Sequence, residues 1–94
     1  RHFNSATVDR AAEYIAGAMQ AAGAAEVEYV PFTAVVEDLR VPQVNVVGTL
    51  PGTDPDAGVV IVGAHYDSRN GDWLDGEIRA PGANDNASGV AALL

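Results

Sequence analysis

Cysteine and lysine are both absent from the 94-residue chain, and its five basic residues are all arginine. Without cysteine the chain can form neither disulfides nor thiolate metal sites, and its redox compartment stays open. Without lysine it cannot contain a Walker-type phosphate-binding loop. Thirteen acidic residues bring the formal net charge to −8, which repels phosphate backbones and anionic lipid surfaces. We therefore expect neither nucleic acid nor a membrane as a partner.

Long apolar runs are missing as well. No run approaches the roughly 18–20 apolar residues that a membrane helix needs, and no secretory signal peptide is recognisable. Hydrophobic residues nevertheless make up 48% of the chain, which is too many for a disordered tail. The length is sufficient for one domain and no more.

The first half of the chain predicts one helix and two strands. Ser5 or Thr7 can cap a helix, and Gly23 is a natural stop for it. Alternating and β-branched residues predict strands over 27–36 and 41–50. The helix has one apolar face at helical spacing, formed by Val8, Ala11, Ala12, Ile15, Met19 and Ala22.

The stretch from Val59 to Ala64 is apolar without alternation, which predicts a third strand, buried on both faces. His65 and Asp67 follow directly, at the carboxyl end of this strand, where open α/β sheets place their ligand sites. Asp85 comes twenty positions after His65, in a turn rich in glycine and asparagine that leads into a helix from Ala87. An imidazole and a carboxylate brought together from two loops are a suitable beginning for a zinc site.

The chain carries two motifs that together resemble the M28 family of zinc aminopeptidases: His65-Tyr66-Asp67-Ser68 and Gly82-Ala83-Asn84-Asp85-Asn86-Ala87-Ser88-Gly89. A third stretch is similar to the entry into the core strand of that family: Asn45-Val46-Val47-Gly48-Thr49-Leu50-Pro51-Gly52. The resemblance implies an α/β fold with a mixed central β-sheet flanked by helices, a three-layer fold that is incomplete in this chain.

The resemblance also implies roles for individual residues. His65 would bind one zinc ion, Asp85 would bridge two zinc ions, and Asp67 would support His65 from behind. Asn86 stands where the family often has a second acid, so it keeps a similar shape without the charge. In the family a Glu-Glu pair, an Asp and another His follow this helix; the first Glu is the general base. No residue up to Leu94 can be assigned to them.

We therefore expect residues 1–94 to be the amino-terminal part of a single M28-like peptidase domain, truncated within a helix and inactive alone. The resemblance implies a zinc-dependent aminopeptidase that hydrolyses amino-terminal residues from peptides. Two alternatives stay open: a non-catalytic peptidase-like binding domain, and a glutaminyl cyclase or carboxypeptidase of related fold. Apolar residues along 59–62 and 90–94 are expected to be exposed and to favour self-association by edge pairing.

Other chemistries fit less well. Four acids in and before the loop 68–80 suggest calcium, but Arg69 and Leu74 stand where a calcium loop needs oxygen ligands. Neither a Gly-x-Ser-x-Gly nor a His-Glu-x-x-His motif is present. A purely structural interpretation, with an Asx-capped helix start and a histidine satisfied by its neighbours, remains the alternative to a metal site. The four acids are Asp67, Asp72, Asp75 and Glu77.

Overall fold

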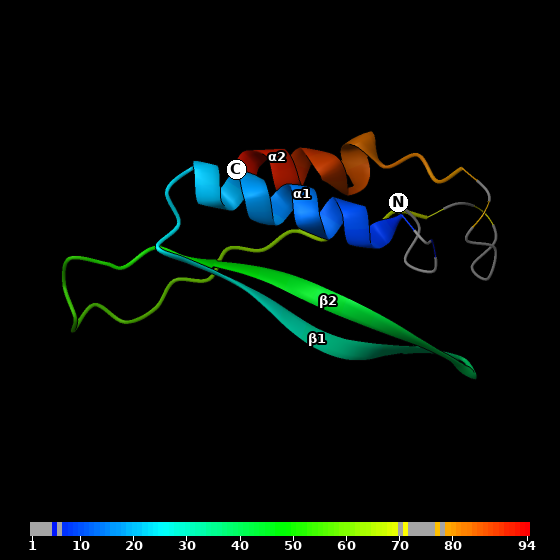
Figure 1. The fold of residues 1–94 in the computed structure, drawn as a ribbon, viewed down its shortest axis with the longest axis horizontal. Coiled ribbons are helices and arrows are strands. Elements are labelled where there is room, and N and C mark those ends of the chain that lie inside the picture. Colours follow the sequence, from blue (N-terminus) through cyan, green and yellow to red (C-terminus); the bar gives the residue numbers. More distant parts are fainter. Residues whose placement is uncertain (1–4, 6, 70, 72–76, 78) are drawn as a thin grey trace.

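The computed structural model describes residues 5, 7–69, 71, 77 and 79–94. Both helices lie on the same side of a two-stranded ribbon, with α1 and α2 next to each other (Figure 1). The arrangement confirms the predicted α/β class. Its elements are α1 (Val8–Ala21), β1 (Glu26–Val36), β2 (Leu39–Thr49), a kinked turn η1 (Ala83–Ala87) and α2 (Ser88–Leu93).

Helix α1 begins and ends close to the predicted positions. Its first amide, on Val8, donates to the carbonyl of Ser5 at 3.0 Å. At the other end Gly23 has a φ of 98°, a left-handed conformation that a residue without Cβ adopts without steric cost. The amides of Gly23 and Ala24 donate back to Gln20 and Met19, which is the Schellman pattern of helix termination.

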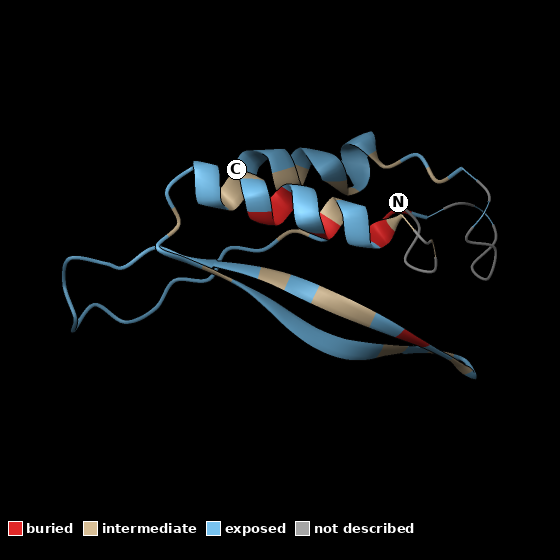
Figure 2. Cartoon of the chain, viewed as in Figure 1, coloured by how far each residue is buried: buried red, intermediate tan, exposed pale blue. Residues whose placement is uncertain are grey.

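The core lies between α1 and the ribbon. Figure 2 shows the buried residues of α1 on its side facing the strands, and the buried set consists of Val8, Ala12, Ile15, Ala16 and Val41. A Cβ on Gly48 would lie 3.0 Å from Sδ of Met19, so the bare glycine lets α1 approach β2 closely. The predicted apolar face is thus confirmed except at Ala22, which is exposed.

Strands β1 and β2 pair antiparallel, from Glu26 opposite Thr49 to Val36 opposite Leu39. Both predicted strands are confirmed, and a two-residue turn joins them. Pro31 lies inside β1, opposite Val44. Proline has no amide hydrogen to donate to a neighbouring strand, and it is tolerated here because, among the described residues, β1 has a neighbour on one edge only.

The third strand predicted over 59–64 is not formed. Among the described residues this segment has no ladder partner, and the sheet has two antiparallel strands rather than the predicted mixed set. Val59, Val60 and Ile61 are 88–89% exposed. A strand buried on both faces needs neighbours along its edges. Here a groove of about 840 Å³ separates the segment 59–67 from β2, so the apolar run lacks those neighbours.

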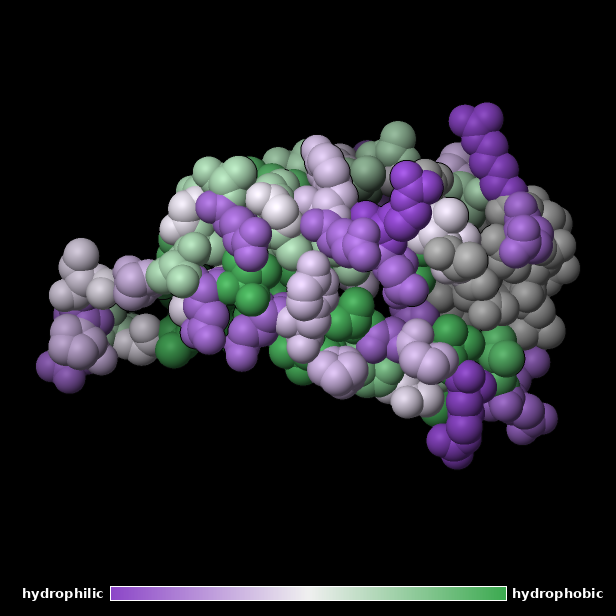
Figure 3. Space-filling model, viewed as in Figure 1, coloured by the Kyte–Doolittle hydropathy of each residue, from purple (hydrophilic) through white to green (hydrophobic). Residues whose placement is uncertain are grey.

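Apolar surface follows this groove. Figure 3 shows patches of hydrophobic side chains between the helices and the ribbon, with hydrophilic side chains among them. Phe32 of β1 and Val47 of β2 line the groove and are 46% and 40% exposed. The predicted exposure is confirmed for Val59 to Val62, whereas over 90–94 it is mixed, since Val90 and Leu93 are half-buried.

Tyr66 connects the unpaired segment to the ribbon. Its hydroxyl donates to the carbonyl of Val44 at 2.5 Å. Partial burial raises the pKa of Tyr66, and the negative charges of Asp9 and Asp67 raise it further. The hydroxyl consequently keeps its proton, and the hydrogen bond, above the usual titration range of tyrosine.

We expect Tyr66→Phe to lower the free energy of unfolding by about 1 kcal/mol, because the carbonyl of Val44 loses its donor. Wild-type stability should also fall as pH rises above about 10, because tyrosine ionises there in the unfolded chain but not yet at Tyr66 in the folded one. Tyr66→Phe should remove that contribution. Urea unfolding from neutral to alkaline pH measures both effects. Tyr29→Phe, at a half-exposed ring on β1, is the control, and equal losses in the two variants would contradict this assignment.

Self-association through residues 59–62 stays a prediction. We expect Ile61→Lys to lower the mean mass in sedimentation velocity toward that of the monomer, since a charge blocks apolar edge pairing. Tyr14→Lys is the matched control, because Tyr14 is 73% exposed on α1 and lies outside the groove. A wild-type chain that sediments as a clean monomer at high concentration would refute the prediction.

Candidate metal centre

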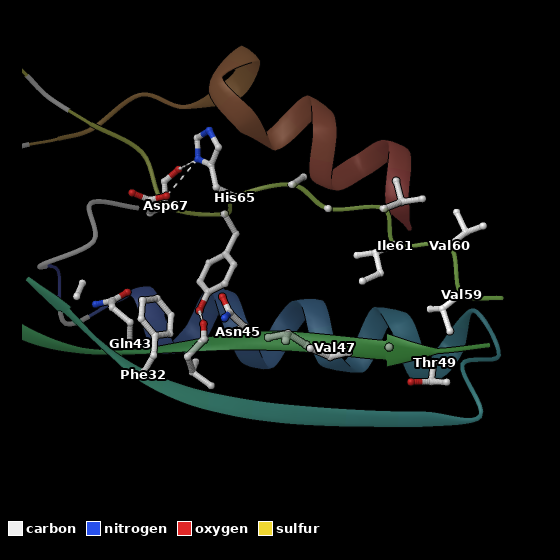
Figure 4. Close-up of a pocket in the computed structure, with 18 of the residues that line it drawn as sticks. Phe32, Gln43, Asn45, Val47, Thr49, Val59, Val60, Ile61, His65 and Asp67 are labelled. Atoms are coloured by element: carbon white, nitrogen blue, oxygen red, sulfur yellow. Dashed lines mark hydrogen bonds and ion pairs between the residues drawn. The ribbon is translucent and has the colours of Figure 1, made fainter. Parts of the chain in front are cut away.

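His65 lies between two carboxylates. Its Nδ1 is 3.1 Å from Oδ1 of Asp67 and 3.2 Å from the Asp67 carbonyl oxygen, and its Nε2 is 2.9 Å from Oδ1 of Asp85. Figure 4 shows His65 and Asp67 facing each other at one end of the segment whose other end carries Val59, Val60 and Ile61. The structure therefore brings together the three residues that the sequence singled out.

The ring of His65 cannot satisfy both carboxylates in its neutral form. A neutral imidazole carries one N–H and donates one hydrogen bond, whereas the protonated ring donates from both nitrogens. The side chains of His65 and Asp85 are 52% and 83% exposed. Ion pairs this exposed contribute at most about 1 kcal/mol, so this pair is too weak to hold the two loops together.

The turn that carries Asp85 is held by its own hydrogen bonds. The amide of Ala87 donates to the carbonyl of Gly82 at 2.9 Å and so closes a wide turn around Asp85. Oδ1 of Asn86 accepts from the amide of Gly89 at 3.1 Å, at the start of α2. This is the Asx-capped helix start that the structural interpretation expects, and it also fixes the course of the backbone beside Asp85.

Ser68 was given no role of its own by sequence reasoning. Its side chain is 3% exposed, and its hydroxyl donates to the carbonyl of Ala80 at 3.0 Å. A Cβ on Gly82 would lie 2.5 Å from Cβ of Ser68, so the bare backbone of Gly82 packs against the Ser68 side chain. The available signal was positional, since Ser68 is three residues after His65 and Gly82 three before Asp85.

The remaining predictions concern metals and membranes. Within the described part of the chain, no group of three or more His, Cys, Asp or Glu side chains is arranged to hold a metal ion. Of the loop residues behind the calcium alternative, Asp72, Leu74 and Asp75 lie outside the described residues. Neither helix of the described part is long and apolar enough to cross a membrane.

Comparison with known proteins gives concordant similarities. The sequence model of Peptidase family M28 matches residues 45–94. A probable zinc metalloprotease of Pyricularia oryzae is 57% identical over 51 residues, which are 53% of this chain and 10% of that protein. A probable leucine aminopeptidase of Trichophyton verrucosum is 51% identical over 53 residues, 55% of this chain and 13% of that protein.

One relative aligns along nearly the whole chain. The Escherichia coli protein YfbL is 38% identical over 92 residues, which are 97% of this chain and 26% of that protein. The chain thus spans about a tenth to a quarter of the length of these curated relatives. No solved structure matches the chain significantly.

We expect Gly89→Ala to lower the hydrogen-exchange protection of the α2 amides about fivefold, because a Cβ there collides with the Asn86 side chain and displaces the cap. Gly17→Ala is the matched control, since no atom lies within 4 Å of its Cβ position inside α1. It should stabilise the chain by about 0.5–1 kcal/mol and leave α2 unchanged. Undiminished protection in Gly89→Ala would show that Asn86 does not cap α2.

Proposed function

This chain belongs to peptidase family M28, and on that premise we propose that it is part of a zinc-dependent aminopeptidase acting on the amino termini of peptides. The observation that carries the proposal is the meeting of His65 and Asp85 from two separate loops, with Asp67 behind the imidazole. The similarity to a probable leucine aminopeptidase supports removal of amino-terminal residues over cyclase or carboxypeptidase chemistry.

The donor atoms suit zinc in kind and in spacing. Zinc in proteins takes imidazole nitrogen and carboxylate oxygen at about 2.0–2.2 Å, so two such atoms on one tetrahedral ion lie about 3.3 Å apart. The 2.9 Å between Nε2 of His65 and Oδ1 of Asp85 needs only a small widening to admit the ion. We propose that His65 and Asp85 would hold zinc through these atoms, and that Asp85 would be the ligand shared by two ions.

Asp67 orients the imidazole. A hydrogen bond from Nδ1 of His65 to Asp67 keeps the proton on that nitrogen and leaves Nε2 free to bind metal. The hydrogen bond also makes Nε2 more basic and so a stronger metal ligand, as carboxylates bonded to zinc-binding histidines do. When bound, zinc polarises the scissile carbonyl and lowers the pKa of the attacking water.

Two ligands do not make a hydrolytic site. Such a site needs at least three protein ligands and an open position, and a base to move protons. The described residues offer no cluster of three. We propose that the 94-residue chain is inactive alone and that the remaining ligands and a glutamate base lie outside residues 1–94. The greater length of the relatives is consistent with this.

The predicted mixed central sheet flanked by helices is part of this proposal. Among the described residues, neither the segment 59–64 nor the edge of β2 away from β1 has a strand partner, and both line the groove. We propose that in the longer protein the segment 59–64 joins a mixed central sheet between helical layers. The side chains of Val59 to Val62, 71–89% exposed in this chain, would then be covered.

Zinc titration of the 94-residue chain by calorimetry tests the proposed ligands. We expect measurable binding that is lost in His65→Ala and in Asp85→Ala, because each substitution leaves a single strong donor. Binding should also weaken in acid, where protons compete with the metal for Nε2. His2→Ala is the control, since His2 is the only other histidine in the chain.

Two results would count against the proposed ligands. Binding that is indifferent to His65 and Asp85 would place zinc elsewhere. Binding lost equally in His2→Ala and His65→Ala would indicate a non-specific histidine effect.

A further inference from the structure

We infer that Ser68 is a positioning residue, which clamps the loop carrying His65 against the loop carrying Asp85 and so sets the separation of Nε2 and Oδ1. As a statement about metal binding, this rests on the proposed function. The clamp is the contact of Ser68 with Ala80 and Gly82.

Burial distinguishes Ser68 from its surroundings. Among the described residues it is the only buried polar side chain, at 3% exposure, in a region where His65 and Asp85 are largely solvent-exposed. The hydroxyl donates to the carbonyl of Ala80 at 3.0 Å. A buried hydrogen bond of this kind is costly to break because the abandoned carbonyl stays without a donor.

The clamp is placed symmetrically with respect to the two proposed ligands. Ser68 follows His65 by three residues, and Gly82 precedes Asp85 by three. The close approach requires glycine at position 82, since a Cβ there would lie 2.5 Å from Cβ of Ser68 and 3.1 Å from its hydroxyl oxygen. The segments 65–68 and 82–85, which carry the two proposed ligands, are therefore joined at the contact of Ser68 with Gly82.

A second bond transmits the clamp to Asp85. The carbonyl of Gly82 accepts from the amide of Ala87 at 2.9 Å, and Asp85 lies inside the turn that this bond closes. A displacement of Gly82 away from Ser68 would move this turn relative to His65. The exposed ion pair between His65 and Asp85 is too weak to oppose such a displacement.

Two readouts on the same chain test the inference. In metal-free protein at one fixed pH, the ¹⁵N shift of His65 Nε2 reports its contact with Asp85. Calorimetry reports zinc affinity. We expect Ser68→Ala to move the Nε2 shift away from its hydrogen-bonded value and to weaken zinc binding about tenfold, the lower range for residues that orient metal ligands.

Ser88→Ala is the matched control. Its hydroxyl also donates to a backbone carbonyl, that of Asn84 at 3.0 Å, but this bond joins the start of α2 to the preceding turn and does not involve the loop that carries His65. We expect both readouts to remain at their wild-type values in this variant.

Gly82→Ala is a second variant that disturbs the contact of Ser68 with Gly82, and it keeps the inference testable if Ser68→Ala folds poorly. A methyl group there would collide with Cβ of residue 68, which Ser68→Ala keeps, so Gly82→Ala should disturb both readouts in the same direction as Ser68→Ala. Wild-type values of the Nε2 shift and zinc affinity in folded Ser68→Ala and Gly82→Ala would overturn the inference.

The two readouts separate this inference from the proposed function. If zinc binds neither wild type nor variants while the Nε2 shift still responds to Ser68→Ala, the metal site fails and the clamp stands. If zinc binds wild type and both clamp variants equally, the metal site stands and the clamp is refuted.

Discussion

The packing of α1 on the β1–β2 ribbon is the interaction on which the other features depend. All buried apolar side chains among the described residues belong to α1 or β2, and the bare backbone at Gly48 lets Met19 approach the strand. The segment after the ribbon is placed against this platform by Tyr66, whose hydroxyl reaches the carbonyl of Val44. The candidate site is thus formed by loops that are attached to a small core.

Such loops need internal bonds to keep their geometry. Ordering each residue costs roughly 1–2 kcal/mol of backbone entropy, and exposed ion pairs return little of it. The hydrogen bonds around the site are correspondingly local: Asn86 to Gly89, Ala87 to Gly82 and Ser68 to Ala80. These bonds fix the shape of the loops without a bound ligand.

The groove beside β2 also results from a shortage of hydrogen-bonding and packing partners. A β-strand edge presents amides and carbonyls that need hydrogen-bonding partners, and an apolar run needs a covering surface. Among the described residues no strand pairs with residues 59–64, so the run lies outside the sheet, and Val59 to Val62 are 71–89% exposed. The segment is as apolar as a buried strand requires, but it does not form the predicted strand because neighbouring strands are missing.

Local patterns sufficed for what depends on neighbours in sequence. Helical spacing located α1, the left-handed preference of glycine located its end at Gly23, and alternation located both strands. The motifs singled out His65, Asp67 and Asp85, although the roles of His65 and Asp85 as ligands and of Asp67 as support for His65 stay proposals. Only the tertiary structure decided the pairing of strands, the fate of 59–64 and the contact of Ser68 with Gly82. These depend on which distant segments are present to supply hydrogen bonds and cover, and no local pattern records that.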